Sequence, residues 1–467
     1  MVYISKNSLY SFLAISISVL LLIFPAIQNG YAIIHPDTGA FIDIGHGRAS
    51  LIGFLTTYPF YLRHLSLSWS NWMVILAQSI VANYVIYLFL KQFMPSRMPW
   101  LLHLLVVIFL LLVTPIGFYT SMLAPEIFTL VFTITTLLFL TEKKLALVHK
   151  ILLGVLIVAL LGLNVVHFYF GLFAVLLFTI QIIKVRVTFS RFLMLKPAVY
   201  LMLILFGYGA ERLIYSEMKG GFTADDSINI VSTYRYVQSG VFDQYFVTNC
   251  ASGNEFEYQA YCSQAGSYKS TFTNLGDFLF NPHSPVYFGS CKQSGWENCW
   301  VNKSKVFQKL QDKILSTEKL TKEHYSFVFA NFCKQLVNFQ TPQIRLLNIK
   351  WQIEKSYRED LYDYLHSNQF VKGFNNKQYP FIHVVFVDVS VLFLLIYLIF
   401  YSKKTSNDNH LMIAFFGGIF ILNAFYYAAY LGVDDMNQSK VAMILPLGVI
   451  VILFKECNKV LTSFYKR

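Results

Sequence analysis

Charged side chains are scarce in this sequence. Asp, Glu, Lys and Arg make up 13% of its 467 residues, whereas soluble domains are usually near a quarter charged. Hydrophobic residues make up 56%, and several apolar runs approach the ~20 residues that a helix needs to cross a bilayer. This composition excludes an ordinary soluble protein and predicts an all-α polytopic membrane protein.

Cysteine is also rare, and no Cys-x-x-Cys pair is present, which disfavours a zinc site. Five of the six cysteines lie in one polar region, namely Cys250, Cys262, Cys291, Cys299 and Cys333. Their close spacing predicts the disulfides Cys250–Cys262 and Cys291–Cys299 and leaves Cys333 unpaired, although other pairings stay open. Because disulfides belong to oxidising compartments, we expect this region outside the cytoplasm.

The apolar runs predict about ten membrane-spanning helices. They cover roughly residues 9–28, 72–93, 100–117, 124–141, 150–166, 169–184, 197–215, 381–401, 410–431 and 440–455. With this assignment the Lys and Arg of the short loops and of the C-terminal tail fall on one side, as the positive-inside rule requires. The net charge of +12 is therefore explained by topology, with both termini cytoplasmic, and we expect no nucleic-acid partner.

Three segments are left on the outer face. They are a loop at 29–71, a short turn at Phe118–Glu126 and a polar insertion at Ser216–Pro380, which is far longer than a connection needs to be. We expect an N-terminal bundle of seven spans (1–215), an α-rich extracytoplasmic domain (216–380) and a C-terminal part with three spans and a cytoplasmic tail (381–467). No internal repeat or low-complexity segment is evident.

Ionisable residues gather in the first outer loop, which holds His35, Asp37, Asp43, His46 and Arg48. Such residues between membrane spans are costly and indicate a site, although a solvated loop is the alternative for each of them. The following segment, Ser50–Leu67, is largely apolar and is interrupted by Arg63 and His64. It predicts an amphipathic helix in the membrane interface.

The second outer loop ends in Glu126, directly before a span. Its carboxylate either complements the helix dipole or belongs to a site. Read together, the loops place an Asp after the first span, then Gly-His-Gly and Tyr-Pro-Phe-Tyr-Leu, and later Tyr-x-Ser-x-Leu-x-x-Glu.

This pattern, over roughly Leu9 to Leu140, resembles the GT-C superfamily of integral-membrane glycosyltransferases, which use polyprenyl-phosphate sugars. In size and loop plan the chain is similar to serotype-converting O-antigen glucosyltransferases. Two features depart from the superfamily. The usual adjacent acidic pair is here Asp37 with Asp43 six residues on, and the arginine before a late Pro-Leu is replaced by Lys440, a poorer match to phosphate.

The resemblance implies a role for each candidate residue. Asp37 is the expected base, with Asp43 as the alternative, and Glu126 orients the acceptor or shares a divalent metal with Asp37. The expected phosphate ligands are Arg48, Arg63, His64 and Lys440, each of which also suits an interfacial side chain. The expected sugar contacts are His35, His46, Tyr58 and His167, the last with an aromatic belt as its alternative.

The implied activity is inverting transfer of a hexosyl group, with glucose favoured, from a polyprenyl phosphate such as undecaprenyl phosphate. The acceptor is a surface polysaccharide such as the O-antigen of lipopolysaccharide, at the periplasmic face of a bacterial inner membrane. No certain cofactor follows, and a divalent metal stays open. An O-antigen polymerase is the alternative, and a lipid or solute transporter, for which inverted repeats are typical, is a third.

Overall fold

The computed structural model describes residues 6–48, 57–141, 145–184, 191–218, 224–251, 258–287, 296–339, 348–373, 378–401 and 407–464. These residues are mostly helical, and no strand occurs among them apart from one isolated bridge between Ile33 and Met122. The fold class is therefore all-α over the described chain, as predicted.

The N-terminal part holds most of the apolar helices. In chain order its helices are α1 (Lys6–Leu22), α2 (Phe24–Asn29), α3 (Thr38–Gly45), α4 (Thr57–Ser66), α5 (Trp72–Phe93), α6 (Pro99–Val113), α7 (Ile116–Ser121), α8 (Ile127–Thr141), α9 (Leu147–Leu161), α10 (Val166–Lys184) and α11 (Arg191–Met218).

The insertion and the C-terminal part are helical as well. The insertion has α12 (Ala224–Ser239), α13 (Val241–Cys250), η1 (Gln259–Gln264), α14 (Tyr268–Thr271), α15 (Leu275–Phe280), α16 (Trp296–Leu315), α17 (Glu318–Val337), α18 (Lys350–Ser356), η3 (Arg358–Asp360), α19 (Leu361–His366) and α20 (Asn368–Lys372). The C-terminal part has α21 (Gln378–Tyr401), α22 (Asn407–Tyr426), the π-helical turn η5 (Tyr427–Leu431), α23 (Asp435–Ala442) and α24 (Ile444–Phe464).

Within the described residues, six helices are long and apolar enough to cross a membrane, and four more are apolar but shorter. All ten coincide with the predicted spans, so the polytopic character is confirmed and the number that cross stays a prediction. The 15 residues of α8 reach only about 22 Å, short of the ~30 Å hydrocarbon core. Almost every side chain of α8 is buried, so this helix packs inside the bundle.

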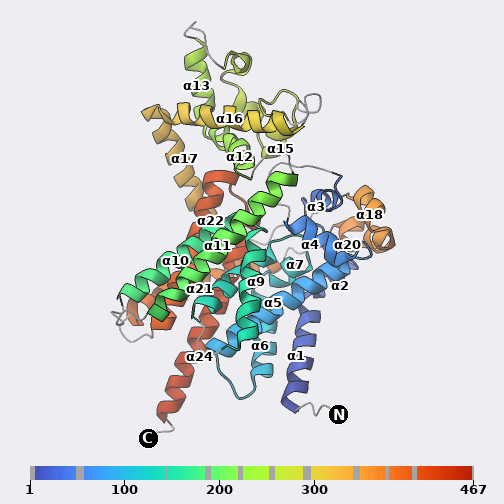
Figure 1. Ribbon diagram of the computed structural model, residues 1–467, viewed down its shortest axis with the longest axis vertical. Helices are drawn as coiled ribbons and strands as arrows, with labels where there is room; N and C mark the ends of the chain where they lie inside the picture. The colour runs from blue at the N-terminus through green and yellow to red at the C-terminus, as the bar shows by residue number, and fades with distance from the viewer. Residues whose placement is uncertain are drawn as a thin grey trace.

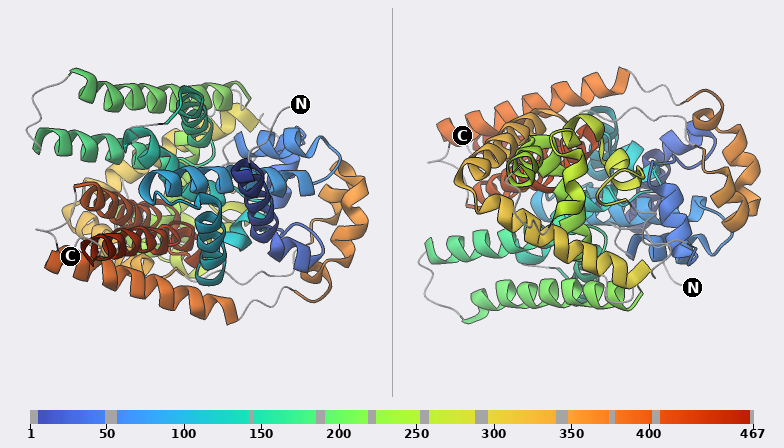
Figure 2. Two further views of the ribbon diagram at one scale, coloured as in Figure 1. Left: turned by 90° about the horizontal axis from the view of Figure 1, so that it is seen from below. Right: turned by 90° about the horizontal axis from the view of Figure 1, so that it is seen from above.

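The molecule has a helical bundle with a separate group of helices above it (Figure 1). The start of α1 and the end of α24 lie at the opposite end of the bundle from α13 and α16. Seen along the long axis, α10 and α11 form one flank, α21 another and α18 to α20 a third (Figure 2).

The predicted 216–380 domain consists of two packing units. Residues 224–320 have a hydrophobic core of their own, built around Tyr234, Phe246 and Phe307. By contrast, Ile353 and Tyr357 of the 348–373 segment belong to the core of the bundle and its first outer loop. We call residues 224–339 the outer domain and residues 348–373 the clamp segment.

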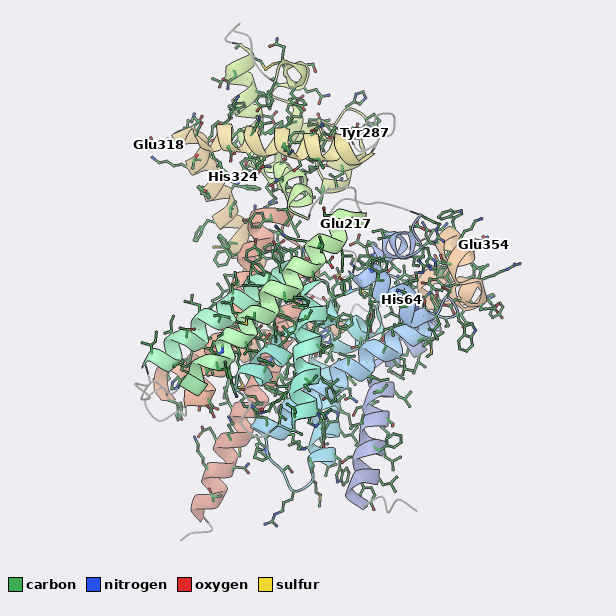
Figure 3. All side chains as sticks on the ribbon, in the orientation of Figure 1. His64, Glu217, Tyr287, Glu318, His324 and Glu354 are labelled. Atoms are coloured by element: carbon green, nitrogen blue, oxygen red, sulfur yellow. A yellow bond between two sulfur atoms is a disulfide. The ribbon has the colours of Figure 1, made fainter. Side chains whose placement is uncertain are left out.

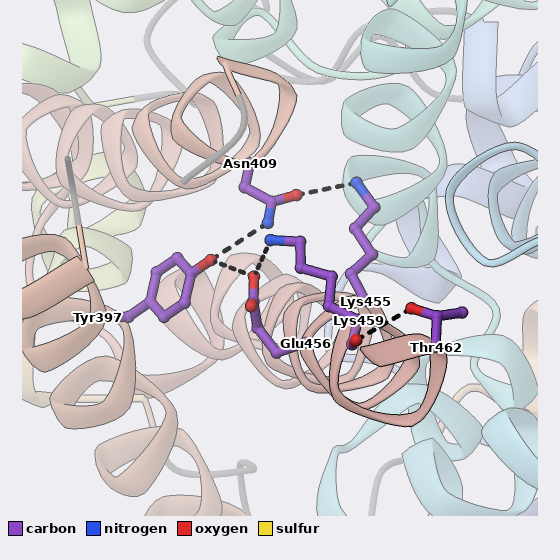
Figure 4. A network of polar contacts seen from close by, with 6 residues as sticks. All are labelled: Tyr397, Asn409, Lys455, Glu456, Lys459 and Thr462. Carbon is purple, nitrogen blue, oxygen red and sulfur yellow. Dashed lines mark hydrogen bonds and ion pairs between the residues drawn. The ribbon is translucent and has the colours of Figure 1, made fainter. Parts of the chain in front are cut away.

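A polar network ties three C-terminal helices together (Figure 4). Tyr397 of α21 donates to Glu456 (2.9 Å) and accepts from Asn409 of α22 (3.3 Å). Lys455 donates to Asn409 (2.8 Å), and Lys459 donates to Glu456 (2.7 Å). These contacts hold α24 against α21 and α22.

The predicted Cys250–Cys262 disulfide is present, with the two Cα atoms 5.7 Å apart. It joins the end of α13 to η1. Cys299 is also disulfide-bonded, and its predicted partner, Cys291, lies outside the described residues. Cys333 is free, as expected.

Candidate functional site

The two outer loops of the N-terminal bundle are joined through their backbones. The amide of Ile33 donates to the carbonyl of Ser121 (2.9 Å), and the amide of Leu123 donates to the carbonyl of Ile33 (2.9 Å). This pairing holds the segment that carries Asp37 beside the segment that carries Glu126. Asp37 and Glu126, two of the three carboxylates singled out from the sequence, therefore belong to one site.

A cavity of about 1220 Å³ lies at this junction, between the bundle and the outer domain. Both parts contribute polar side chains to its wall. Those from the loops and the bundle include His35, Asp37, Tyr58, Glu126, Asp434 and Lys440, and those from the outer domain include Arg235, Gln238 and Lys269.

Asp37 lies directly before α3, with its side chain 43% exposed at the cavity wall. Its amide donates to Nδ1 of His35 (3.1 Å), and the Asp37 carboxylate lies 3.6 Å from the same nitrogen. Partial burial raises the pKa of the Asp37 carboxyl above the ordinary value, and the nearby Glu126 and Asp434 add to this, against an opposing effect of His35. Such a carboxylate suits proton transfer.

Glu126 directly precedes α8 and is buried at the cavity wall. Its Oε2 atom accepts no hydrogen bond from any residue that the structure describes. The start of α8 favours a negative charge, but a buried carboxylate oxygen without a donor is rare in folded proteins. The arrangement indicates a ligand that brings a donor of its own.

Two buried cations face the same cavity, Arg235 of α12 and Lys440 of α23, each 2% exposed. Lys440 donates to the hydroxyl of Tyr427 (2.7 Å), and Nη2 of Arg235 donates to the carbonyl of Ala428 (2.9 Å). Neither forms an ion pair in the described part of the chain, and Nε of Arg235 has no acceptor there. Burial lowers the pKa of Arg235 to about 10, so it remains protonated at neutral pH.

The turn η5 anchors both cations, because it supplies the hydroxyl of Tyr427 and the carbonyl of Ala428. A π-helical turn shifts the backbone register and is frequent at functional sites. Glu126 and Asp434 act on the charge of Lys440 from across the cavity, but no carboxylate contacts either cation among the described residues. Burying a cation without such a contact is costly, so an anionic group of a ligand would stabilise the pair.

The other predicted acidic residue, Asp43, lies on α3 away from the cavity lining. It pairs with Nε of Arg48 (2.9 Å) and accepts from Gln352 of α18 (3.2 Å). The guanidinium of Arg48 in turn lies over the ring of Trp351, 5.4 Å from its centre. Asp43 and Arg48 hold the clamp segment against the first outer loop.

Three more predicted residues lie on this side of the molecule, outside the cavity wall. Arg63 and His64 are exposed on α4, and Arg63 donates to the carbonyl of Gly45 (2.9 Å). Nε2 of His46 lies 3.3 Å from the hydroxyl of Tyr357. The part of the predicted interfacial helix that is described is α4, and residues 50–56 lie outside the described residues.

The two remaining predicted sugar contacts differ from each other. Tyr58 lines the cavity, and its hydroxyl donates to Gln78 (2.9 Å). His167 is fully buried in α10, where its ring stacks on Phe132 with centroids 4.7 Å apart. Because it does not line the cavity, His167 acts as a packing residue in this structure.

Arg235 was not singled out from the sequence. It stands between two tyrosines with no recognisable motif around it. Its position depends on a hydrogen bond to Ala428, 193 residues away in the sequence. The sequence shows that the insertion contains this arginine, but it does not indicate that the arginine lines a site.

Among the described residues, no group of three or more His, Cys, Asp or Glu side chains is placed to hold a metal ion. The divalent metal therefore stays a prediction.

No protein-family model, curated protein or solved structure matches the chain. The resemblance to GT-C glycosyltransferases stays a prediction too. The functional argument depends on the cavity itself.

Proposed function

We propose that this protein is an integral-membrane glycosyltransferase. It moves a hexosyl group, with glucose favoured, from a polyprenyl phosphate to a surface polysaccharide such as O-antigen, at the periplasmic face of a bacterial inner membrane. One observation carries the proposal: a single cavity holds two buried cations that contact no carboxylate among the described residues, together with the carboxylates of Asp37, Glu126 and Asp434. A phosphate-linked donor and a hydroxyl acceptor need these two kinds of group.

Arg235 and Lys440 bind the donor phosphate in this proposal. As the bond between the sugar and the phosphate breaks, negative charge grows on the leaving polyprenyl phosphate. Cations that are already held in position stabilise that charge without reorganising during the reaction. The planar guanidinium of Arg235 matches phosphate better than an ammonium does, so it supplies the arginine that the sequence pattern lacked at Lys440.

Asp37 serves as the general base. It takes the proton from the acceptor hydroxyl, whose oxygen then attacks the anomeric carbon from the face opposite the phosphate. The carbon–oxygen bond to the phosphate breaks and the configuration is inverted. Glu126 accepts a hydrogen bond from a sugar hydroxyl, which satisfies its buried oxygen. Pockets for small ligands measure about 300–1,000 Å³, so this cavity has room for both sugars.

The test compares the full-length protein with Asp37→Asn and with the matched control Asp43→Asn, in detergent with a panel of polyprenyl-phosphate hexoses. We expect Asp37→Asn to lower sugar transfer to polysaccharide about 100-fold or more, as loss of a general base does, and Asp43→Asn to keep most of it. Loss of sugar transfer in Asp43→Asn alone would assign the role of general base to Asp43. Absence of any dependence on a carrier lipid would refute the transferase and favour the transporter.

An O-antigen polymerase is the second candidate, because Arg235 places an outer-domain arginine at the cavity. Such an enzyme joins lipid-linked oligosaccharides to one another. Incubation with pyrophosphate-linked repeat units alone separates the candidates, since a polymerase lengthens them and the proposed transferase leaves them unchanged.

A further inference from the structure

The exposed face of α17 changes character along its length. Near its start, Glu318 and Lys322 form an ion pair (2.6 Å), with side chains 82% and 75% exposed. Further along, Tyr325, Phe329 and Val337 are 59%, 65% and 68% exposed. Figure 3 shows Glu318 above His324, with His324 nearer the bundle. The half of α17 that lies nearer the bundle, residues 325–337, therefore exposes large apolar side chains; we call it the apolar half.

The opposite face of the same half is firmly packed. The side chain of Gln335 exchanges two hydrogen bonds with the backbone of Asp434, both of 2.8 Å. Phe327 and Asn331 contribute to the wall of the cavity. The orientation of α17 is thus fixed, and its large apolar side chains point away from the protein.

This apolar surface continues the outward surface of α22. Phe332 contacts Phe425 edge to face, with centroids 6.2 Å apart. Phe425 and Ile421 are themselves 53% and 51% exposed, and they lie in a segment that is long and apolar enough to span a membrane. A contiguous apolar surface of this kind marks an interaction site. Its continuity with a membrane-spanning helix points to lipid as the partner.

We propose that residues 325–337 of α17 lie in the bilayer, in the leaflet on the side of the outer domain. Tyr325 then lies at the membrane–water boundary, where tyrosine is enriched. Lys334 is the one charged side chain exposed in this half, and its aliphatic stem reaches toward the lipid phosphates. The outer domain is therefore partly embedded, and α17 forms a wall between the cavity and the acyl chains. This inference does not depend on the proposed function.

Cys333 is free and exposed on this face, so it can carry the probe without a new substitution there. The full chain with Cys457→Ser is labelled with a nitroxide without reductant and placed in nanodiscs of phosphatidylethanolamine and phosphatidylglycerol. Collisions with oxygen, which concentrates in acyl chains, are compared with collisions with a water-soluble nickel complex. We expect oxygen to dominate several-fold at Cys333.

The matched control is Lys322→Cys with Cys333→Ser and Cys457→Ser, at which we expect nickel to dominate. Phe329→Cys in the same background tests a second position on the apolar half and should behave like Cys333. Nickel accessibility equal to that of Lys322→Cys at either position would overturn the proposal. Protection from both reagents would also overturn it, because it would mean that protein covers this face.

Discussion

At the scale of single residues, the pKa of Asp37 depends on the charges of the other residues in the cavity wall. In its proposed role as general base Asp37 has to be deprotonated, so sugar transfer should fall as the pH drops through the pKa of Asp37. Because burial and the charges of Glu126 and Asp434 raise that pKa, we expect the acidic limb of the pH profile to lie above the range of an ordinary aspartate. Glu126→Gln removes one of these charges and should move the limb to lower pH.

The measurement is the midpoint of the acidic limb of kcat/KM, which reports the free enzyme and does not depend on the height of the profile. Asp43→Asn is the control, since Asp43 lies outside the cavity wall and its loss should leave the midpoint unmoved. A limb that stays in place in Glu126→Gln, or moves to higher pH, would contradict the proposed coupling.

Arg235→Met separates function from folding. The substitution removes a buried charge that contacts no carboxylate, and it also removes the hydrogen bonds to Ala428 and Gln238 and the contact with the ring of Phe327. These effects on stability have opposite signs. We expect little change in the unfolding temperature without donor. Loss of a charged hydrogen bond to phosphate, worth about 1.5–3 kcal/mol, should lower transfer roughly 10- to 100-fold.

Tryptophan fluorescence on heating and the transfer assay check this prediction on the same preparations. Lys269→Met is the matched control, because Lys269 is a cation of the cavity wall that is exposed and should matter less. A large fall in the unfolding temperature of Arg235→Met would instead assign Arg235 a structural role.

The sequence supported predictions for some of these residues and not for others. Asp37 and Glu126 could be found because a carboxylate next to a membrane span is unusual in itself. Asp43 is also a carboxylate close to a membrane span, yet it forms an ion pair with Arg48. This contact depends on how α3 packs against α18, which the sequence does not reveal. Arg235 gave almost no signal, because its position depends on η5.

At the scale of elements, the clamp segment positions the loop that carries Asp37. The side chain of Gln369 in α20 accepts from the amide of Ile34 (2.8 Å) and donates to its carbonyl (2.7 Å), much as a neighbouring strand would. Nearby, Asp360 accepts hydrogen bonds from Tyr31 (2.8 Å) and Asn71 (2.7 Å). Hydrogen bonds from polar side chains of the clamp segment therefore hold this loop in place.

Gln369→Leu preserves the volume and removes both bonds to Ile34. Two backbone groups are left without partners, at a cost of about 1–3 kcal/mol each, and Asp37 is held less accurately. We expect kcat to fall about tenfold or more with KM for the donor little changed, because positioning acts on the chemical step.

Steady-state kinetics with varied donor check this effect. Asn368→Ala is the neighbouring control, which loses only a bond to the carbonyl of Gln28 and should stay within about twofold of the wild type. A rise in KM alone would place Gln369 in donor binding. The sequence predicted an α-rich domain over residues 216–380 but gave no reason to expect that Gln369 contacts the first outer loop.

At the scale of the whole molecule, apolar runs were a dependable guide to the bundle, since each predicted span coincides with an apolar helix. Burial in a bilayer leaves a strong compositional signal that needs no knowledge of neighbours. The division of the insertion into the outer domain and the clamp segment leaves no such signal. Residues 348–373 are far from residues 29–71 in the sequence. The two segments meet in the folded protein, and no local sequence pattern indicates this contact.

Residues near the two ends of the molecule can report which side of the membrane each end faces. The exposed Cys457 lies near the end of α24, at the end of the bundle far from the outer domain. In Cys333→Ser we expect an impermeant maleimide to label Cys457 only after spheroplasts are permeabilised. Lys322→Cys, with both free cysteines replaced by serine, should react in intact spheroplasts.

The opposite pattern would put the cavity and the Cys250–Cys262 disulfide in the cytoplasm. Thiols are kept reduced there, and lipid-linked sugars on the outer leaflet would not reach the site. Reversed labelling would therefore contradict both the positive-inside assignment and the proposed donor. The expected pattern places the two buried cations of the cavity on the outer side of the membrane, where a phosphate at the end of a polyprenyl chain can reach them.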